Sequence, residues 1–121
     1  MKDYFPEEEF KSVGCKKSNM SVKLLLMLNR VREYVGFPLI LTSAYRSPAA
    51  EKSCGRSGTS SHTKGLAIDI YCIDGASRLA IVQAAFAIGF RRIGIGPDFI
   101  HLDIDSTKPN SMWTYYKPSN F

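Results

Sequence analysis

Two short segments of the sequence carry Leu or Ile at every second position, and this two-residue period limits the possible folds more than any other feature. A period of two is that of a β-strand with one buried face. The apolar faces are formed by Leu66, Ile68 and Ile70 in residues 66–71, and by Ile100, Leu102 and Ile104 in residues 99–105. Each strand must therefore be covered by other elements on its apolar side, while its other side is left for polar side chains.

Patterns elsewhere in the chain predict the elements that cover these strands. Apolar residues at helical spacing, Leu24, Leu28, Val31 and Val35, predict a helix over residues 21–35. The other expected elements are an extended arm with one short turn over residues 1–20, helices over 47–52 and 75–88, and strands over 38–45, 91–95 and 112–116. This order predicts one α+β domain over residues 1–121, with a small, mostly antiparallel sheet and flanking helices.

Capping and turn residues mark the ends of these elements. The helix caps are Ser18 or Ser21 before the first long helix and Gly36 after it, Ser47 before the short helix, and Asp74 and Gly89 around the last helix. Pro38 prevents the first helix from continuing, and Pro48 suits a first helical position. The turn formed by residues 96–98 predicts that the strands on either side of it pair as an antiparallel hairpin.

The charge balance favours anionic partners but not a dedicated nucleic-acid surface. The 121 residues include 16 Lys and Arg against 11 Asp and Glu, which gives a net charge of +5. The basic residues are spread along the chain without a long run, so no specific nucleic-acid partner is expected. The longest apolar run, residues 24–28, is too short to span a bilayer, which requires about 20 residues.

The cysteines and the N-terminal residues indicate a cellular setting. Three cysteines are a poor disulfide framework, and the sequence has no CxxC pair that would indicate a thiolate zinc site. The acidic N-terminus lacks the apolar core of a secretory signal peptide. The missing signal segment predicts a chain that is made in the cytoplasm, like a phage or prophage product that is released at lysis or carried on a virion. We also expect the protein to be a monomer.

The two histidines of the chain, His62 and His101, occur near carboxylates in a pattern that suits metal ligation. His101 shares the polar face of its strand with Asp103 and Asp105, and Asp69 occupies the polar face of the other strand. Two imidazoles, one carboxylate and a water form a ligand set that is typical of catalytic zinc. The alternative is an exposed sheet edge with solvated charges, and Asp105 is expected to be a solvated carboxylate.

Three motifs, at residues 43–48, 60–69 and 98–101, carry a family resemblance. Residues 60–69 read SSHTKGLAID and match SxHxxGxAxD, SAYRSP lies upstream, and DFIH places a carboxylate three residues before the second histidine. Together they resemble the zinc D-alanyl-D-alanine carboxypeptidase family, the LAS-type metallopeptidases, which are related in fold to the hedgehog signalling domain. The resemblance implies a hedgehog/DD-peptidase-like α+β fold and a peptidase that uses one Zn2+ ion.

The resemblance also implies roles for single residues. His62, Asp69 and His101 would bind the Zn2+ ion. Asp98 would act as general base and acid, taking a proton from water and delivering it to the leaving amine. Arg46 would contact the substrate and stabilise the developing oxyanion.

Further residues would support this site. Ser60 would lie near the bound substrate. Asp103 would hydrogen-bond the nitrogen of a ligand histidine that does not bind the metal. Glu51 stands where relatives often carry Asn, so the resemblance does not define this part of the pocket wall. Residues 113–116, which include Trp113 and two tyrosines, are expected to pack at the end of the sheet rather than line the cleft. The turn before Asp98 is expected to bend the Asp98 side chain over the metal.

Three classes of function follow, with the first favoured. The first is a zinc peptidase that hydrolyses peptidoglycan stem peptides, as a D-Ala-D-Ala carboxypeptidase, a D-Ala-D-Ala dipeptidase or an L-Ala-D-Glu endopeptidase. The second is a non-catalytic zinc- and cell-wall-binding module or a phage structural component, against which the presence of a base at Asp98 argues. The third, a basic nucleic-acid binder, predicts DNA affinity that falls steeply with salt.

Overall fold

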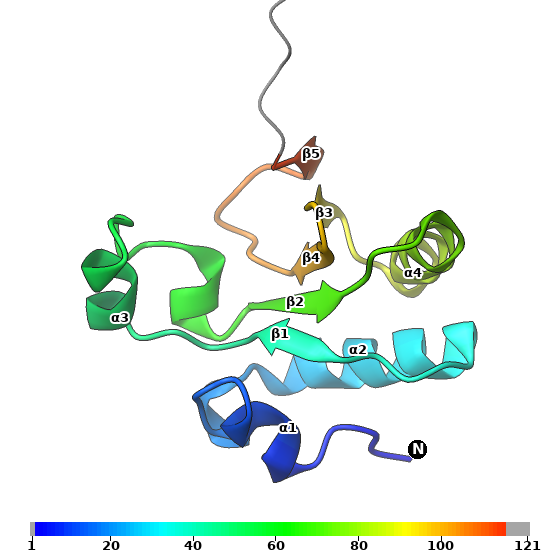
Figure 1. Ribbon diagram of the computed structural model, residues 1–121, viewed down its shortest axis with the longest axis horizontal. Coiled ribbons are helices and arrows are strands. Elements are labelled where there is room, and N and C mark those ends of the chain that lie inside the picture. Colours follow the sequence, from blue (N-terminus) through cyan, green and yellow to red (C-terminus); the bar gives the residue numbers. More distant parts are fainter. Residues whose placement is uncertain (1, 116–121) are drawn as a thin grey trace, which may run out of the picture.

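A five-stranded sheet forms the centre of the computed structural model, which describes residues 2–115 (Figure 1). The strands are β1 (Leu41–Ser43), β2 (Ala67–Tyr71), β3 (Arg92–Ile95), β4 (Phe99–Asp103) and β5 (Ser111–Thr114). Their order across the sheet is β1-β2-β4-β3-β5. All neighbouring pairs are antiparallel except β3 and β5, which are parallel. The predicted α+β class with a mostly antiparallel sheet is confirmed.

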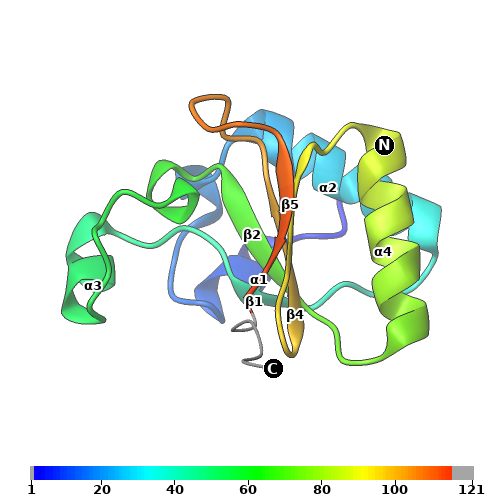
Figure 2. The same ribbon diagram turned by 90° about the horizontal axis from the view of Figure 1, so that it is seen from above.

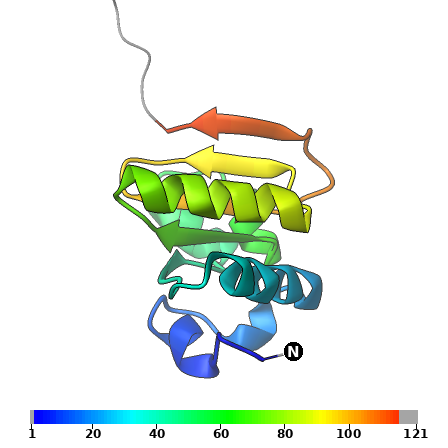
Figure 3. The same cartoon turned by 90° about the vertical axis from the view of Figure 1, so that its right-hand side faces the viewer.

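The helices lie on different sides of this sheet. They are α1 (Glu7–Lys11), α2 (Val22–Val35), α3 (Pro48–Ser53) and α4 (Gly75–Ile88), with 3-10 turns η1 (Lys17–Asn19) and η2 (Ser61–Lys64). The two long helices α2 and α4 contact each other and lie in front of the strands in Figure 3. Seen from above, α3 lies on the far side of the sheet from α4 (Figure 2). No helix in the described part of the chain is long and apolar enough to cross a membrane.

The hydrophobic core lies between the long helices and the apolar face of the central strands. Ile68 and Ile70 of β2 and Ile100 and Leu102 of β4 are fully buried, as the alternation predicts. The helices contribute Leu24, Leu28, Val31, Ile81, Ala84 and Ala85 to the same cluster. Because this face of β2 and β4 is buried in the core, their alternate side chains point to the other face, where the polar residues gather.

The helix ends were predicted accurately because the local cap chemistry is simple. The Ser21 hydroxyl accepts a hydrogen bond from the Leu24 N–H, and Gly36 adopts the left-handed conformation that ends α2. Ser47 caps α3 and Asp74 caps α4 in the same way, through hydrogen bonds from Ala50 N–H and Ser77 N–H. Helix α4 has the bounds that the sequence predicted.

The N-terminal arm is more ordered than the predicted extended segment with one short turn. It contains both α1 and η1, and Phe5 and Phe10 are buried in the core cluster. Three glutamates occupy the first turn of α1, where the helix dipole favours negative charge. The two phenylalanines fix the arm, because burying each ring stabilises the folded chain by about 2 kcal/mol.

The strand predicted over residues 38–45 is reduced to the three residues of β1. Leu41 pairs with Ile70 but Ser43 pairs with Asp69, so one extra residue bulges out of β1 between them. Beyond the bulge the chain leaves β2 and hydrogen-bonds η2 instead, with the Arg46 N–H donating to the His62 carbonyl at 3.3 Å. This departure from the sheet brings residues 44–46 beside His62. The predicted edge strand over 112–116 is confirmed as β5, although Tyr116 lies outside the described residues.

Candidate metal centre

The structure brings His62, Asp69 and His101 together in one group, which we call the His–Asp–His group. Asp69 on β2 pairs directly with His101 on β4, and η2 carries His62 to the same place. His62 Nε2 lies 3.4 Å and His101 Nδ1 lies 2.9 Å from Asp69 Oδ1. The three ligand-type atoms lie within 4.8 Å of one another, and all three side chains are largely buried.

Each histidine ring also forms a hydrogen bond through the nitrogen that points away from Asp69, and this bond fixes the orientation of the ring. His62 Nδ1 lies 2.7 Å from the Ala44 carbonyl oxygen, which can only accept, so this nitrogen carries the proton and Nε2 keeps a lone pair. His101 Nε2 lies 2.7 Å from Asp103 Oδ2, which holds the other ring in the same manner. The bulge in β1 therefore contributes to the site, since it places the Ala44 carbonyl against His62.

The donor set fits a zinc ion. Two imidazole nitrogens and one carboxylate oxygen converge from three elements, and each histidine has an acceptor behind it, as zinc-binding histidines require. A cation between these atoms would replace the proton that His101 Nδ1 and Asp69 Oδ1 share across 2.9 Å. Zinc takes four ligands in a tetrahedron, so three protein ligands would leave one position for water or substrate.

The electrostatics of the group keep Asp69 ionised. Burial by itself would raise the pKa of Asp69, but the hydrogen bonds to His101 and His62 outweigh this effect and lower the pKa to about 2. Burial would lower the pKa of His101, whereas the carboxylates of Asp103 and Asp69 on either side of the ring raise it. Asp69 is therefore a full anion at neutral pH and a strong ligand for a cation.

Asp103 is held by two partners besides His101. Its Oδ1 atom accepts hydrogen bonds from Arg92 Nε at 2.7 Å and from the Asp105 N–H at 3.0 Å. The Arg92 guanidinium in turn lies over the Trp113 ring, 4.8 Å from the ring centre. The structure therefore places Asp103 at the ring nitrogen of His101 that points away from Asp69.

A cavity of about 460 Å³ opens over the His–Asp–His group. One wall is aromatic and is formed by Phe99, Trp113 and Tyr115, with the Trp113 ring centre 5.3 Å from that of His101. Trp113 was predicted to pack rather than line the cleft, but it does both, because it also lies on Gly94. A Cβ atom at Gly94 would lie 2.7 Å from Trp113 Nε1 and 2.8 Å from the Tyr115 ring, so only glycine lets these rings approach β3.

Arg46 and Ser60 also line the cavity, and both are held by Glu51. The Glu51 carboxylate accepts hydrogen bonds from Arg46 Nε at 3.1 Å and from the Ser60 hydroxyl at 2.6 Å. Ser43 Oγ accepts a further bond from Arg46 Nη1. Burial by itself would raise the pKa of Glu51, but the bonds from Ser60 and the charge of Arg46 hold it below its ordinary value. The residue that departs from the family pattern is thus fully buried beneath the predicted substrate contacts.

Asp98 is not brought to the His–Asp–His group. It lies exposed in the turn between β3 and β4, where its carbonyl accepts a hydrogen bond from the Cys72 N–H at 2.9 Å. Among the described residues that line the cavity, the carboxylates are Asp69 and Asp103. The expected bend of the turn over the metal is therefore absent from this conformation.

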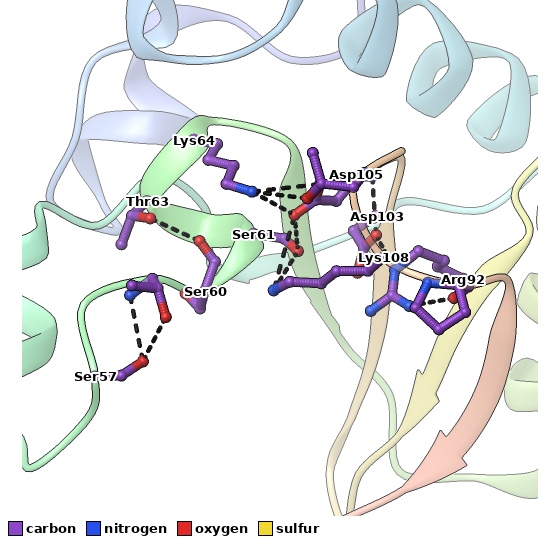
Figure 4. Close-up of polar contacts among 12 residues, drawn as sticks. Ser57, Ser60, Ser61, Thr63, Lys64, Arg92, Asp103, Asp105 and Lys108 are labelled. Atoms are coloured by element: carbon purple, nitrogen blue, oxygen red, sulfur yellow. Dashed lines mark hydrogen bonds and ion pairs between the residues drawn. The ribbon is translucent and has the colours of Figure 1, made fainter.

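The prediction of a solvated Asp105 is wrong. This side chain is 1% exposed and binds η2 and the loop after β4 (Figure 4). The alternation that places His101 and Asp103 on one face of the strand also places Asp105 there, so the sequence contained a signal for its position. Glu51 and Tyr115 also belong to the site. The resemblance places Glu51 at the pocket wall without giving it a role, and Tyr115 was expected to pack at the end of the sheet.

Comparison with known proteins agrees with this geometry. The family model described as Peptidase M15 matches residues 5–103. The chain belongs to the peptidase M15 family. No curated protein matches the chain. The matched M15 region contains the whole His–Asp–His group, Arg46, Ser60 and Asp103, whereas Asp105, Lys108 and most of the aromatic wall follow it in the chain. Membership of the M15 metallopeptidases and a buried group suited to zinc therefore support each other.

Proposed function

We propose that this M15 chain is a zinc-dependent peptidase that hydrolyses the stem peptides of peptidoglycan. The observation that carries the proposal is the convergence of His62 Nε2, His101 Nδ1 and a carboxylate oxygen of Asp69 beneath an open cavity. A structural zinc site would have four protein ligands and no adjoining cavity. Three ligands with an open side are the arrangement of a catalytic site.

The three residues of the group would hold the ion, and their partners would keep them in place. A zinc ion in such a site acts as a Lewis acid toward a peptide carbonyl and makes water more acidic. The hydrogen bonds from His62 to the Ala44 carbonyl and from His101 to Asp103 keep one tautomer on each ring. This tautomer points the free nitrogen of each ring at the same point, so the ligands need little rearrangement to bind.

Arg46 would bind the peptide carbonyl as negative charge develops on its oxygen. Its Nε and Nη1 atoms are held by Glu51 and Ser43, which leaves Nη2 without a protein acceptor among the described residues. A guanidinium fixed in this way stabilises an oxyanion without the cost of reorienting itself. Ser60, tied to the same carboxylate, would offer a hydroxyl to the substrate backbone.

Asp98 would take the proton from the attacking water and pass it to the leaving amine. Asp69 and Asp103, the carboxylates that line the cavity, are each already bonded to a histidine. Asp98 has no such partner among the described side chains and lies at the end of the strand that carries His101. To act as the base it must swing in when substrate is bound, and catalytic contacts commonly tighten only in the substrate complex.

The charges around the cavity suit an acidic peptide. Four basic side chains line it, against two carboxylates, Asp69 and Asp103; the basic residues are Arg46, Arg56, Arg92 and Lys108. Stem peptides carry several carboxylates, and the +5 charge of the chain would also favour approach to an anionic cell wall. The scissile bond is that of a D-Ala-D-Ala carboxypeptidase, a D-Ala-D-Ala dipeptidase or an L-Ala-D-Glu endopeptidase.

The test is incubation of the purified, zinc-loaded protein with muropeptides, followed by mass spectrometry of the products. Release of one D-Ala, release of the D-Ala-D-Ala dipeptide, or separation of L-Ala from D-Glu identifies the bond. Cleavage should stop on addition of a chelator and in a His62→Ala variant. If the zinc-loaded protein cleaves no stem-peptide bond, the proposed function is wrong.

A second candidate is a non-catalytic module that binds zinc and the cell wall. The exposed position of Asp98, away from the cavity, favours it, because a binding module needs no base. An Asp98→Asn variant separates the two candidates. Loss of cleavage with unchanged binding to purified cell walls supports the peptidase, whereas a wild-type protein that binds walls without cleaving them supports the module. The phage setting stays a prediction, which an adjacent holin or tail gene would support.

A further inference from the structure

Asp105 is a buried carboxylate that joins two parts of the site. It lies two residues beyond the end of β4 and is 1% exposed. A carboxylate that is buried without partners destabilises a protein strongly, so its partners must offset the loss of hydration. The partners of Asp105 come from two separate segments of the chain (Figure 4).

The first set of partners lies on η2, the turn that carries His62. The Ser61 hydroxyl donates to Asp105 Oδ2 at 2.8 Å, and Lys64 Nζ lies 3.1 Å from the same oxygen. Ser61 immediately precedes His62, so this bond fixes the start of the turn. Figure 4 shows both side chains reaching from η2 toward Asp105.

The second set of partners lies on the segment that follows His101. The Asp105 N–H donates to Asp103 Oδ1 at 3.0 Å, and the other oxygen of Asp103 holds His101. Asp105 Oδ1 accepts from the Thr107 hydroxyl at 2.6 Å and from the Thr107 N–H at 3.1 Å. One residue is therefore bonded both to the turn of the first histidine and to the carboxylate behind the second.

The charges around Asp105 keep it ionised in this position. Lys108 Nζ lies 3.8 Å from Asp105 Oδ2 and 3.2 Å from the Ser61 hydroxyl, so two lysines face one buried carboxylate. Burial alone would raise the pKa of Asp105, but the hydrogen bonds from Thr107 and Ser61 outweigh it and hold the pKa far below its ordinary value. The link is thus a set of charge-assisted hydrogen bonds, which are stronger than neutral ones.

We propose that Asp105 is a positioning residue that sets the distance between the two histidine ligands by tying η2 to the end of β4. His62 lies on a short 3-10 turn, and such turns are held poorly by their own hydrogen bonds. The hydrogen bonds of His62 to Ala44 and Arg46 tie the turn to the segment after β1, not to β4. Without the link through Asp105 the turn can shift relative to β4, and the His62 nitrogen would then miss the point at which His101 and Asp69 converge. The inference rests on the zinc site of the proposed function but not on the substrate.

The test compares zinc affinity in an Asp105→Asn variant and in the wild-type protein, measured by competition with a chelator. The asparagine keeps the shape of the side chain and can keep the Thr107 bonds, but it removes the charge and turns an amide toward Lys64 and Ser61. Zinc affinity should fall about tenfold, the lower end for loss of a residue that supports a metal ligand. A Ser61→Ala variant, which loses a single bond of the same link, should show a smaller loss in the same direction.

Two matched variants exclude a general effect on folding. Ser12→Ala removes an exposed hydroxyl at the end of α1 that donates to the Glu9 carbonyl, and Asp74→Asn repeats the acid-to-amide change at the exposed cap of α4, where asparagine caps equally well. Both should keep wild-type zinc affinity. Denaturant unfolding of each metal-free variant reports its stability separately.

The outcomes separate this inference from the proposed function. If Asp105→Asn and Ser61→Ala bind zinc as tightly as the wild-type protein, or if Ser12→Ala and Asp74→Asn lose as much affinity as they do, the inference is wrong. If the wild-type chain binds no zinc, both are wrong. If zinc affinity falls as expected but no stem peptide is cleaved, Asp105 keeps its role and only the substrate assignment fails.

Discussion

Replacing Glu51 by Gln should weaken both the stability of the protein and its activity, because one carboxylate holds both Arg46 and Ser60. The substitution keeps the shape of the side chain and removes its charge. Two charge-assisted hydrogen bonds, from Arg46 Nε and from the Ser60 hydroxyl, become neutral or are lost. Hydrogen bonds to charged groups contribute about 1 kcal/mol more than neutral ones, so the expected loss is about 2 kcal/mol.

Solvent moderates this loss on the arginine side. The Arg46 side chain is 26% exposed, so water partly replaces the missing carboxylate and the larger cost of an unpaired buried charge does not apply in full. For a domain of this size, a loss of 2 kcal/mol corresponds to a fall in Tm of about 8 °C. The exposed Glu8→Gln exchange in α1 is the matched control and should lower Tm much less, because an exposed charge at a helix N-terminus contributes only about 0.3–1 kcal/mol.

The pH dependence gives this prediction a definite sign. The pKa of Glu51 is lowered in the folded protein, so its ionised form contributes stability above the ordinary Glu value of about 4.3. This contribution is lost as the pH falls through the lower folded value. The stability difference between the wild-type protein and Glu51→Gln, measured by denaturant unfolding, should therefore be full at neutral pH and shrink in acid.

Activity should respond differently from metal binding. Glu51 contacts none of the three candidate ligands, so zinc affinity should stay at the wild-type value, while kcat on a stem peptide should fall because Arg46 is no longer fixed. If the variant matches Glu8→Gln in Tm and the wild-type protein in kcat, the assignment of Glu51 as the residue that holds Arg46 is wrong.

Three further predictions concern the metal and the aromatic wall. Removing zinc with a chelator should lower Tm in the wild-type protein, and the same chelator should leave Tm unchanged in His62→Ala if the metal site is correctly placed. Zinc affinity should fall as the pH drops through the raised pKa of His101, because protons then compete with zinc for that ring while Asp69 stays ionised. A zinc affinity that does not change with pH would contradict this ligand set. Gly94→Ala should destabilise the protein by about 1–3 kcal/mol and shift the fluorescence of Trp113, since a Cβ atom at residue 94 would lie 2.7 Å from the indole nitrogen. Unchanged fluorescence would show that the Trp113 ring does not lie on β3.

The parts of the fold that local chemistry decides could be predicted from the sequence. The two-residue period placed Asp69 and His101 on the polar face of their strands, and they are direct neighbours across β2 and β4. Helix ends followed from cap residues such as Ser21 and Asp74, whose side chains accept bonds within the same turn. These features depend on residues a few positions apart, so the sequence contains them directly.

The parts that depend on distant segments could not be predicted in the same way. Alternation places Asp105 on the polar face, but only the packing of η2 against that face decides that it is buried. The bulge in β1 follows from a competition between β2 and η2 for the backbone of residues 44–46. The direction of the turn at Asp98 is a third case, because a turn motif fixes that the chain reverses but not where a side chain in the turn points.

The position of β5 at the edge of the sheet gives the two sides of the cavity different resistance to opening. Among the described strands, β5 lies at the edge of the sheet with a single neighbour, whereas β2 and β4, which carry Asp69 and His101, each lie between two others. Backbone amides of an edge strand exchange with solvent through local fraying, while those of central strands require larger unfolding. The wall that carries Trp113 can therefore open by local fraying of β5, while the strands that carry Asp69 and His101 stay paired on both sides.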